Sequence, residues 1–408
     1  MNILIIGNGF DLAHGLPTRY DDFLDFCETV RRIYTYSGDA SRKDYIYHNI
    51  DEWEINDDIK KLLLEAFDKR DCKKNLNDDC THNLKVTISY KFLNELYTHI
   101  VKNTWLEYFL EFRSSIGENW IDFETEISKV IQVLDEAISV KKSGKEINEM
   151  QKEKQKILLD VQKASGRSMQ KAFKDVTALS DFAVFLDAEL GRLVRALEIY
   201  IVEFVGKIPA IEKNVDIEKL NLDHVLSFNY SDTYERIYSK GKEVECDYIH
   251  GKADISKNVN TSNLVLGIDE YLDDNKKNKE LGLLSFKKFY QRIYKSTVNR
   301  YLEWVDEIKD GYANYLKPHS ISGEAEYPEH NLYIFGHSLD ITDRDVLKMF
   351  ICNENVQTKI FYYRKNQEDK TELGKLIRNL ILIMGQEELI RRTGGVHKTI
   401  EFVPQTVK

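Results

Sequence analysis

A short apolar run that leads directly into two glycines is the feature that most restricts the fold of this chain. Residues 3–6 read Ile-Leu-Ile-Ile, a pattern typical of a short buried strand, and Gly7 and Gly9 follow at once. Glycine is required where the backbone adopts a positive φ, or where a phosphate approaches backbone N–H groups. A strand followed by a glycine loop and a helix is therefore typical of a nucleotide-binding α/β domain, although a structural turn alone would also account for these glycines.

The spacing of the glycines excludes the usual dinucleotide fingerprint of dehydrogenases. That fingerprint places a third glycine three residues after the second. Leu12 occupies this position here, and the next glycine is Gly15, which is followed by Leu16 and Pro17. An ordinary dehydrogenase is therefore excluded.

Predicted strands return only in the second half of the sequence. Residues 20–32 predict a helix, residues 50–210 have a helical pattern almost throughout, and short apolar segments follow from residue 222 onward. Because strands then alternate with helices, we expect an α/β fold, a Rossmann-like parallel sheet with a large all-helical insertion. We assign residues 1–30 and 215–408 to the α/β domain and residues 31–214 to the insertion. The later expected strands are 222–228, 245–249, 264–267, 331–335, 359–363 and 396–403, and the later expected helices are 283–308 and 371–392.

Composition narrows the class of protein. The 408 residues include 58 Lys and Arg against 68 Asp and Glu, a formal net charge of −10, which argues against a protein that mainly coats nucleic acid. No stretch is apolar enough for a membrane span, and the N-terminal segment lacks the basic region and cleavage site of a signal peptide. The 5 cysteines form no Cys-x-x-Cys pair, which predicts a reduced, cytoplasmic protein without a zinc site.

Three further motifs follow the glycine loop in a fixed order, and each is placed at the end of a predicted strand. They are Ser-Phe-Asn-Tyr-Ser-Asp at 227–232, Tyr-Ile-His-Gly at 248–251 and Phe-Gly-His-Ser-Leu-Asp at 335–340. Together with the glycine loop they resemble the NAD-binding motifs of the sirtuin-like superfamily. Residues 7–20 also look like the signature of the AbiH family, which is named for bacteriophage abortive infection, and Trp-Ile-Asp-Phe-Glu at 120–124 resembles a helix of that family. The resemblance covers both ends of the chain well and the middle poorly.

The resemblance implies an NAD site at the carboxyl ends of the strands. Asn229 and His250 would be catalytic: the amide would orient a ribose hydroxyl and a water molecule, and the imidazole would accept a proton from one of them. There are plainer alternatives. Asn229 could cap the end of a strand, and His250 could be a buried histidine that hydrogen-bonds to a backbone carbonyl. Breaking the nicotinamide–ribose bond passes through an oxocarbenium-like centre, and the cationic leaving group needs no acid. Residues expected to contact the nucleotide are Gly7, Asn8, Gly9, Phe10, Asp11, Gly15, Pro17, Gly251, Gly336, His337, Ser338 and Asp340.

Three departures from the sirtuin pattern qualify this comparison. Asp11 stands where sirtuins carry serine, and a carboxylate beside a phosphate loop is unfavourable unless it caps a helix, holds a ribose or binds a cation. Ser231 replaces an aspartate, although Asp232 is adjacent. No Cys-x-x-Cys pair follows His250, so the zinc module of protein deacetylases is missing and hydrolysis of NAD is the expected residual activity.

The expected function is hydrolysis of NAD to nicotinamide and ADP-ribose in an anti-phage system, which would make the protein an NAD glycohydrolase. One alternative is a non-catalytic sensor of NAD or an ADP-ribose-like nucleotide, and another is a metal-dependent nuclease that uses Asp11 with Asp340, Asp343 and Asp345. We assign no metal ligands. We expect His14, His224 and His319 to be structural.

The helical insertion is the expected site of contacts with other proteins. Its amphipathic helices could pack against a second copy of the chain, and a phage-derived or accessory protein could act as a trigger. Residues 141–174, rich in Lys, Glu and Gln, predict a solvated helical hairpin, with a partner-binding arm as the alternative.

Overall fold

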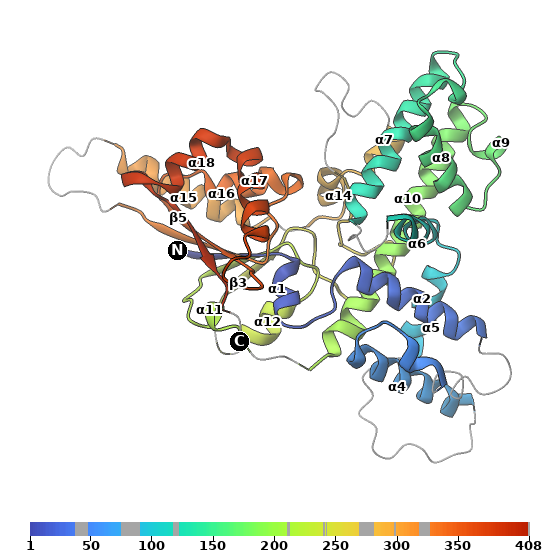
Figure 1. The fold of residues 1–408 in the computed structure, drawn as a ribbon, viewed down its shortest axis with the longest axis horizontal. Helices are drawn as coiled ribbons and strands as arrows, with labels where there is room; N and C mark the ends of the chain where they lie inside the picture. Colours follow the sequence, from blue (N-terminus) through green and yellow to red (C-terminus); the bar gives the residue numbers. More distant parts are fainter. Residues whose placement is uncertain are drawn as a thin grey trace. The chain divides into compact units, whose positions relative to one another are not determined.

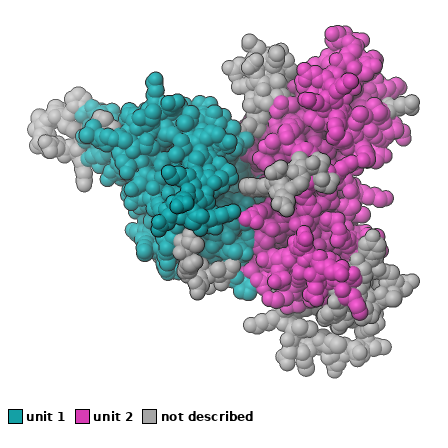
Figure 2. All heavy atoms as spheres, in the orientation of Figure 1, with its two compact units in different colours: residues 1–16, 209–252, 297–408 teal, residues 17–208, 253–296 magenta. Residues whose placement is uncertain are grey.

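The chain folds into two compact units, which are coloured separately in Figure 2. The computed structural model describes residues 1–36, 48–74, 90–116, 122–209, 213–239, 241, 243–268, 281–297, 299–317 and 327–406 (Figure 1). Unit 1 comprises residues 1–16, 209–252 and 297–408, and unit 2 comprises residues 17–208 and 253–296. These limits differ from the domain boundaries expected at residues 30 and 215, mainly because residues 253–296 join the helical unit.

Unit 1 is built on a parallel sheet, which has six strands within the described residues. In chain order these are β1 (Asn2–Ile6), β2 (His224–Ser227), β3 (Glu245–Tyr248), β4 (His330–Phe335), β5 (Val356–Tyr362) and β6 (Ile400–Pro404). Their order across the sheet is β3-β2-β1-β4-β5-β6, and every pairing is parallel. This is the strand order of the Rossmann fold, and it confirms the predicted α/β class.

Both faces of the sheet are covered, which is why β1 is apolar at successive positions. Side chains alternate between the two faces of a strand. Ile3 and Ile5 therefore join the core cluster formed with helices α15 (Tyr301–Tyr315), α16 (Arg344–Ile351) and α17 (Thr371–Met384). Leu4 and Ile6 join the cluster on the other face, where α1 (Asn8–Ala13), α11 (Val215–Glu218) and α12 (Thr233–Tyr238) pack.

The predicted strand at 264–267 is wrong. These residues are not in the sheet, because the amide side chain of Gln291 replaces a strand partner: it accepts from the N–H of Leu266 and donates to its carbonyl. An isolated bridge joins the next residue, Ile268, to Lys287.

The long helices predicted in the second half of the chain are interrupted. Residues 283–308 divide among α13 (Leu281–Leu284), α14 (Lys288–Tyr294) and the start of α15. Residues 371–392 divide at Gly385, which has φ +88°, into α17 and α18 (Gln386–Thr393). The predicted strand at 396–403 is the shorter edge strand β6.

Unit 2 is helical, with α10 (Val176–Ile199) at its centre. This helix packs against α5 (Tyr90–Ile100), α6 (Thr104–Ile116) and α7 (Phe123–Lys142). The other α-helices described in the unit are α2 (Tyr20–Tyr36), α4 (Asp57–Lys74), α8 (Lys152–Ala164), α9 (Met169–Ala172), and the short α13 and α14. Helix α8, from the charged segment, buries only Leu158 and Val161, as expected of a solvated helix. None of the described helices is long and apolar enough to cross a membrane.

Candidate functional site

The glycine loop packs directly against the loop that follows β4. Helix α1 begins immediately after Gly7, and the N–H of Gly9 donates to the carbonyl of Gly336 at 2.8 Å. A Cβ on Gly9 would lie 2.8 Å from the Cα of Gly336, and a Cβ on Gly7 would lie 2.8 Å from the Cα of His337. Gly336 itself has φ +67°, and a Cβ there would overlap backbone atoms of Gly9 and Phe10. The three glycines are therefore needed so that two backbone segments can touch.

This packing changes the interpretation of the glycine motif. The N–H of Gly9 already donates to Gly336, and the N–H of Phe10 donates to the carbonyl of Gly7 at 2.9 Å. A phosphate bound to these groups would have to displace both bonds. Direct nucleotide contact by the loop stays a prediction, and close packing explains its glycines without a ligand.

Two residues of the predicted loop lie further along the chain. Gly15 forms the turn after α1, with φ +69°. Pro17 begins unit 2, and its carbonyl accepts from the hydroxyl of Tyr200 at 2.7 Å. The backbone conformation of Gly15 accounts for that glycine, and a nucleotide contact by Pro17 stays a prediction.

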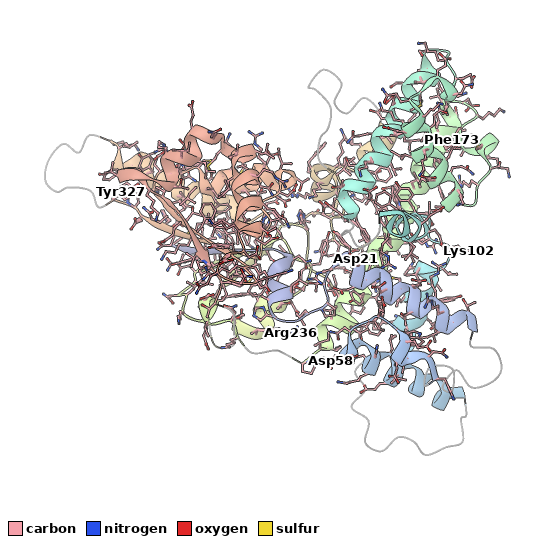
Figure 3. The ribbon with its side chains drawn as sticks, viewed as in Figure 1. Asp21, Asp58, Lys102, Phe173, Arg236 and Tyr327 are labelled. Carbon is pink, nitrogen blue, oxygen red and sulfur yellow. The ribbon has the colours of Figure 1, made fainter. Side chains whose placement is uncertain are left out.

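Asp11 is buried in a cluster of hydroxyl groups on α1 and the segment after β2. It is 1% exposed, and the hydroxyl of Ser231 donates to its Oδ2 at 2.6 Å. Thr233 donates in turn to Ser231 at 3.0 Å, while Oδ1 of Asp11 has no hydrogen-bond partner among the described residues. Burial raises the pKa of Asp11 to about 6, and the hydroxyl groups and the charge of Arg236, labelled in Figure 3, offset this only in part.

Asparagine at position 11 is expected to stabilise the protein more at neutral than at acidic pH. Burial penalises the ionised carboxylate above about pH 6, and the penalty disappears as the pH falls toward 4 because the native carboxyl group becomes protonated. The stability of Asp11→Asn relative to the wild type should therefore rise by about 2 kcal/mol between pH 4 and pH 8, at about 1.4 kcal/mol per pKa unit. Urea unfolding of both proteins across this range measures the difference. A difference that does not vary with pH would contradict the raised pKa.

Asn229 joins the end of β2 to the glycine loop. Its side chain is buried, and Nδ2 donates to the carbonyl of Gly7 at 2.9 Å. Its backbone N–H donates to the hydroxyl of Ser227 at 3.1 Å. The side-chain NH2 group of Asn229 therefore has a structural role, as in the alternative in which this residue caps the end of a strand. A role in orienting substrate would fall to its side-chain carbonyl.

His250 and His337 face the same carboxylate at the carboxyl end of the sheet. Nε2 of His250 lies 3.5 Å from Oδ1 of Asp343, and Nε2 of His337 lies 3.5 Å from Oδ2. These side chains are 6%, 3% and 11% exposed, for His250, His337 and Asp343 respectively. Phe228 contacts both imidazoles edge-on, with ring centroids 5.6 Å from His250 and 4.3 Å from His337. Gly251, with φ +79°, turns the chain away after His250.

Asp343 is the functional candidate that sequence reasoning misjudged. It was expected only as one of three acidic residues, but it is the one directed at the histidines. Asp340 instead caps the turn Ile341–Asp343 by accepting from the N–H of Thr342 at 3.0 Å, and Asp345 is exposed. No group of three or more His, Cys, Asp or Glu in the described part of the chain is placed to hold a metal ion. The nuclease alternative therefore has no metal-ligand set there.

The remaining candidates are held by ordinary structural contacts. The side chain of Ser338 is exposed, and its carbonyl accepts from Asn379 of α17 at 2.9 Å. His14 contacts the carbonyl of Phe10 and the hydroxyl of Tyr238, each at 2.7 Å. His224 stacks on a tryptophan of α15, and His319 and residues 120–121 of the Trp-Ile-Asp-Phe-Glu motif lie outside the described residues.

The comparison with known families covers the same motifs. Residues 3–363 match the family described as Bacteriophage abortive infection AbiH, and the match runs from the glycine loop past the loop after β4. No curated protein and no solved structure matches the chain. The relation to sirtuins stays a prediction. Because the family match spans most of the sequence and includes every residue of the candidate site in unit 1, the chain belongs to the AbiH family of bacteriophage abortive infection proteins.

Proposed function

We propose that this protein hydrolyses NAD to nicotinamide and ADP-ribose during abortive infection of phage-infected cells. The family supports the biological setting. The observation that carries the chemistry is the buried pair of His250 and Asp343 at the carboxyl end of a Rossmann-ordered sheet. Histidine is the side chain best suited to exchange a proton near neutral pH.

The position of the pair agrees with the binding rule for open α/β sheets. Ligands bind beyond the carboxyl ends of the strands, at the point where the strand order reverses. In this sheet the reversal occurs at β1, which has β2 on one side and β4 on the other. Asn229 follows β2, Gly7 follows β1 and His337 follows β4, so the candidate residues surround this point.

A single base is sufficient for the proposed reaction. The oxygen of a water molecule bonds to C1′ of the ribose while the C1′–nitrogen bond breaks and its electron pair neutralises the nicotinamide ring. In this proposal the imidazole of His250, which lies beside the carboxylate of Asp343, takes the proton from the water and later releases it to solvent. The carboxylate of Asp343 stabilises the imidazolium that forms, and the carbonyl of Asn229 orients the ribose or the water.

Incubation of the purified protein with NAD, followed by chromatography of nicotinamide and ADP-ribose, tests this proposal. We expect wild-type turnover and a fall of about 100-fold or more in His250→Ala, the usual contribution of a general base. His224→Ala is the matched control. His224 begins β2, so it lies at the end of the sheet opposite to the candidate site, and it stacks on Trp304. Equal turnover in His250→Ala and the wild type would contradict the proposal. No turnover, together with a nucleotide-dependent rise in melting temperature, would favour the sensor instead.

A further inference from the structure

An open groove lies among the helices of the charged segment in unit 2. Helix α8 contacts α7, α9 and the turn Ile147–Glu149 there (Figure 1). The groove has a volume of about 780 Å³, which is within the usual size range of ligand sites, about 300–1,000 Å³. It is therefore large enough for several side chains of a partner. Its apolar lining consists of Ile147, Leu158, Leu159, Met169 and Phe173.

The groove exposes apolar side chains that its own unit does not cover. Leu159 is 39% exposed and Met169 is 51% exposed. Single exposed apolar residues are common on protein surfaces, but two that line the same hollow form a patch. A partner that buried both side chains would gain stability from the hydrophobic effect.

The walls of the groove are held in place without a ligand. The side-chain amide of Gln155 donates to the carbonyls of Asn148 and Met150, at 3.1 and 2.6 Å, and so joins α8 to the turn before it. Phe173, labelled in Figure 3, packs edge-on against Phe182 of α10, with ring centroids 5.7 Å apart. Because the groove is formed in advance, a partner does not have to order its walls on binding.

The rim of the groove is basic in a chain that is acidic overall. Residues 141–174 include 10 Lys and Arg against 4 Asp and Glu, a formal net charge of +6, whereas the whole chain has −10. Glu146 lines the groove but is paired with Lys141 at 2.7 Å. Lys171 and Lys174 also line the groove, are exposed, and have no acidic partner among the described residues. Their charges are therefore available to an acidic partner.

We propose that this groove binds an acidic amphipathic helix of a partner protein. The apolar face of such a helix covers Leu159 and Met169, and its carboxylates pair with Lys171 and Lys174. An apolar floor with a basic rim is complementary to this chemistry in both respects. Such binding does not depend on the hydrolysis of NAD.

Two other anionic partners fit the groove less well. A nucleic acid presents phosphates but no apolar side chains for the floor, and the aromatic residue that lines this groove, Phe173, is buried and cannot stack on a base. An anionic membrane is bound by apolar side chains that project into it, whereas Leu159 and Met169 line a hollow. The acidic helix is therefore the partner that matches both the floor and the rim.

A designed peptide tests the proposal with the full-length protein. The probe is a fluorescein-labelled helix with leucine at positions i, i+3, i+4 and i+7 and glutamate on its other faces, and fluorescence anisotropy measures its dissociation constant. We expect micromolar binding that weakens as salt is added, because the charges of the rim are exposed. The same peptide with lysine in place of glutamate should bind at least about 10-fold more weakly. No binding of the acidic peptide at about 1 mM, or equal binding of the lysine peptide, would overturn the proposal.

Substitutions inside and outside the groove show where the peptide binds. Met169→Glu should weaken binding by at least about 10-fold, because it places a carboxylate against the apolar face of the peptide. Lys171→Glu should weaken it by about 3- to 10-fold at low salt. Val184→Glu and Lys152→Glu are the matched controls: both residues are exposed, neither lines the groove, and the changes in charge are the same. Urea unfolding checks that all four variants keep the fold. A control that loses as much affinity as the variant it matches would overturn the proposal.

Two further measurements test other occupants of the groove. Unlabelled oligothymidylate and vesicles of phosphatidylserine compete with the peptide only if the groove binds these anions, and light scattering shows whether it joins two copies of the chain. We expect no competition, and the same mass for the wild type and Met169→Glu. Competition by either anion, or a wild-type dimer that Met169→Glu dissociates, would assign the groove to that occupant and overturn the proposal.

Discussion

Gly336→Ala is expected to prevent unit 1 from reaching its native packing. The added methyl group would overlap the backbone nitrogen of Phe10 and the carbonyl carbon of Gly9, neither of which can rotate away. Its φ of +67° adds a backbone penalty of about 1 kcal/mol. We expect the free energy of unfolding to fall by more than about 4 kcal/mol, which is a large part of the stability of a typical domain. Thermal and urea unfolding measure the loss.

Gly395→Ala separates the two causes of this loss. Gly395 has a similar φ of +71°, but a Cβ there would meet nothing within 4 Å. Gly395→Ala should therefore lower the free energy of unfolding only by the backbone penalty, about 1 kcal/mol. If the two variants lose the same stability, the close contact of the glycine loop with the loop after β4 is not the reason that Gly336 is glycine.

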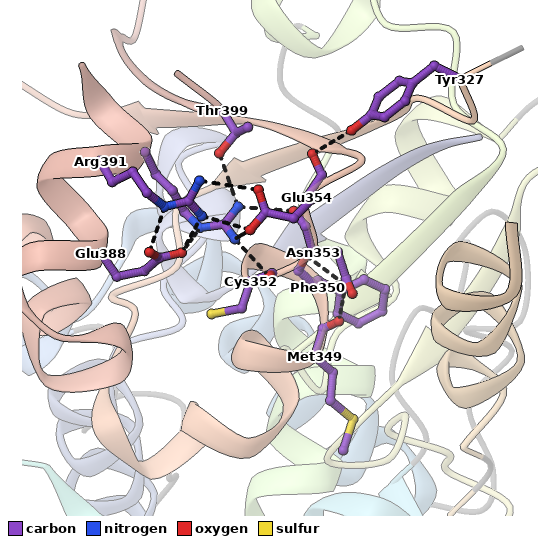
Figure 4. Close-up of polar contacts among 10 residues, drawn as sticks. Tyr327, Met349, Phe350, Cys352, Asn353, Glu354, Glu388, Arg391 and Thr399 are labelled. Carbon is purple, nitrogen blue, oxygen red and sulfur yellow. Dashed lines mark hydrogen bonds and ion pairs between the residues drawn. The ribbon is translucent and has the colours of Figure 1, made fainter. Parts of the chain in front are cut away.

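Arg392→Met is expected to lower the free energy of unfolding by about 3 kcal/mol. The substitution removes a buried cation and leaves several hydrogen-bond acceptors without a donor. The side chain of Arg392 is 1% exposed. Its guanidinium donates to the carbonyls of Cys352 and Asn353 at the end of α16, and to Glu354. Figure 4 labels these three acceptor residues. The guanidinium also donates to Glu388 and to Thr399 next to β6. One side chain of α18 thus caps α16 and joins it to the edge of the sheet.

Arg391→Met is the matched control for this prediction. Arg391 contacts the same two glutamates, Glu354 and Glu388, but its side chain is 37% exposed. Exposed ion pairs contribute at most about 1 kcal/mol. Urea unfolding of both variants should therefore show a small loss for Arg391→Met and a much larger one for Arg392→Met. A loss below about 1 kcal/mol for Arg392→Met would contradict the capping role.

The sequence predicts the sheet better than it predicts the site. The buried run at residues 3–6 and the later alternation of strands and helices are local patterns, and they are sufficient to predict a parallel α/β sheet. The segment 264–267 has the same apolar pattern, but the backbone N–H and carbonyl of Leu266 bond to the side chain of Gln291, and no local pattern shows that.

The site depends on contacts between residues far apart in the chain. The four motifs identify His250 and Asn229, because each lies at a strand end. The position of Asp343 beside two histidines could not be predicted in this way, since an aspartate at the start of a helix is usually solvated. Its orientation toward His250 follows only from the fold. The hydrogen bond from the N–H of Leu339 to Nδ1 of His337 likewise depends on the left-handed conformation of Leu339, which sequence alone does not indicate.

The central strand of the sheet has a consequence for how this protein is made. Asn2 of β1 contacts Asp223 across 221 residues and Asn331 across 329 residues, so its neighbours in the sheet are synthesised long after it. At about 5–20 residues per second, a nascent chain waits on the order of 15–65 s for β4 to emerge. Residues 17–208 form most of unit 2 and leave the ribosome before β2 and β4. Unit 1 therefore completes its sheet only after most of unit 2 has been synthesised.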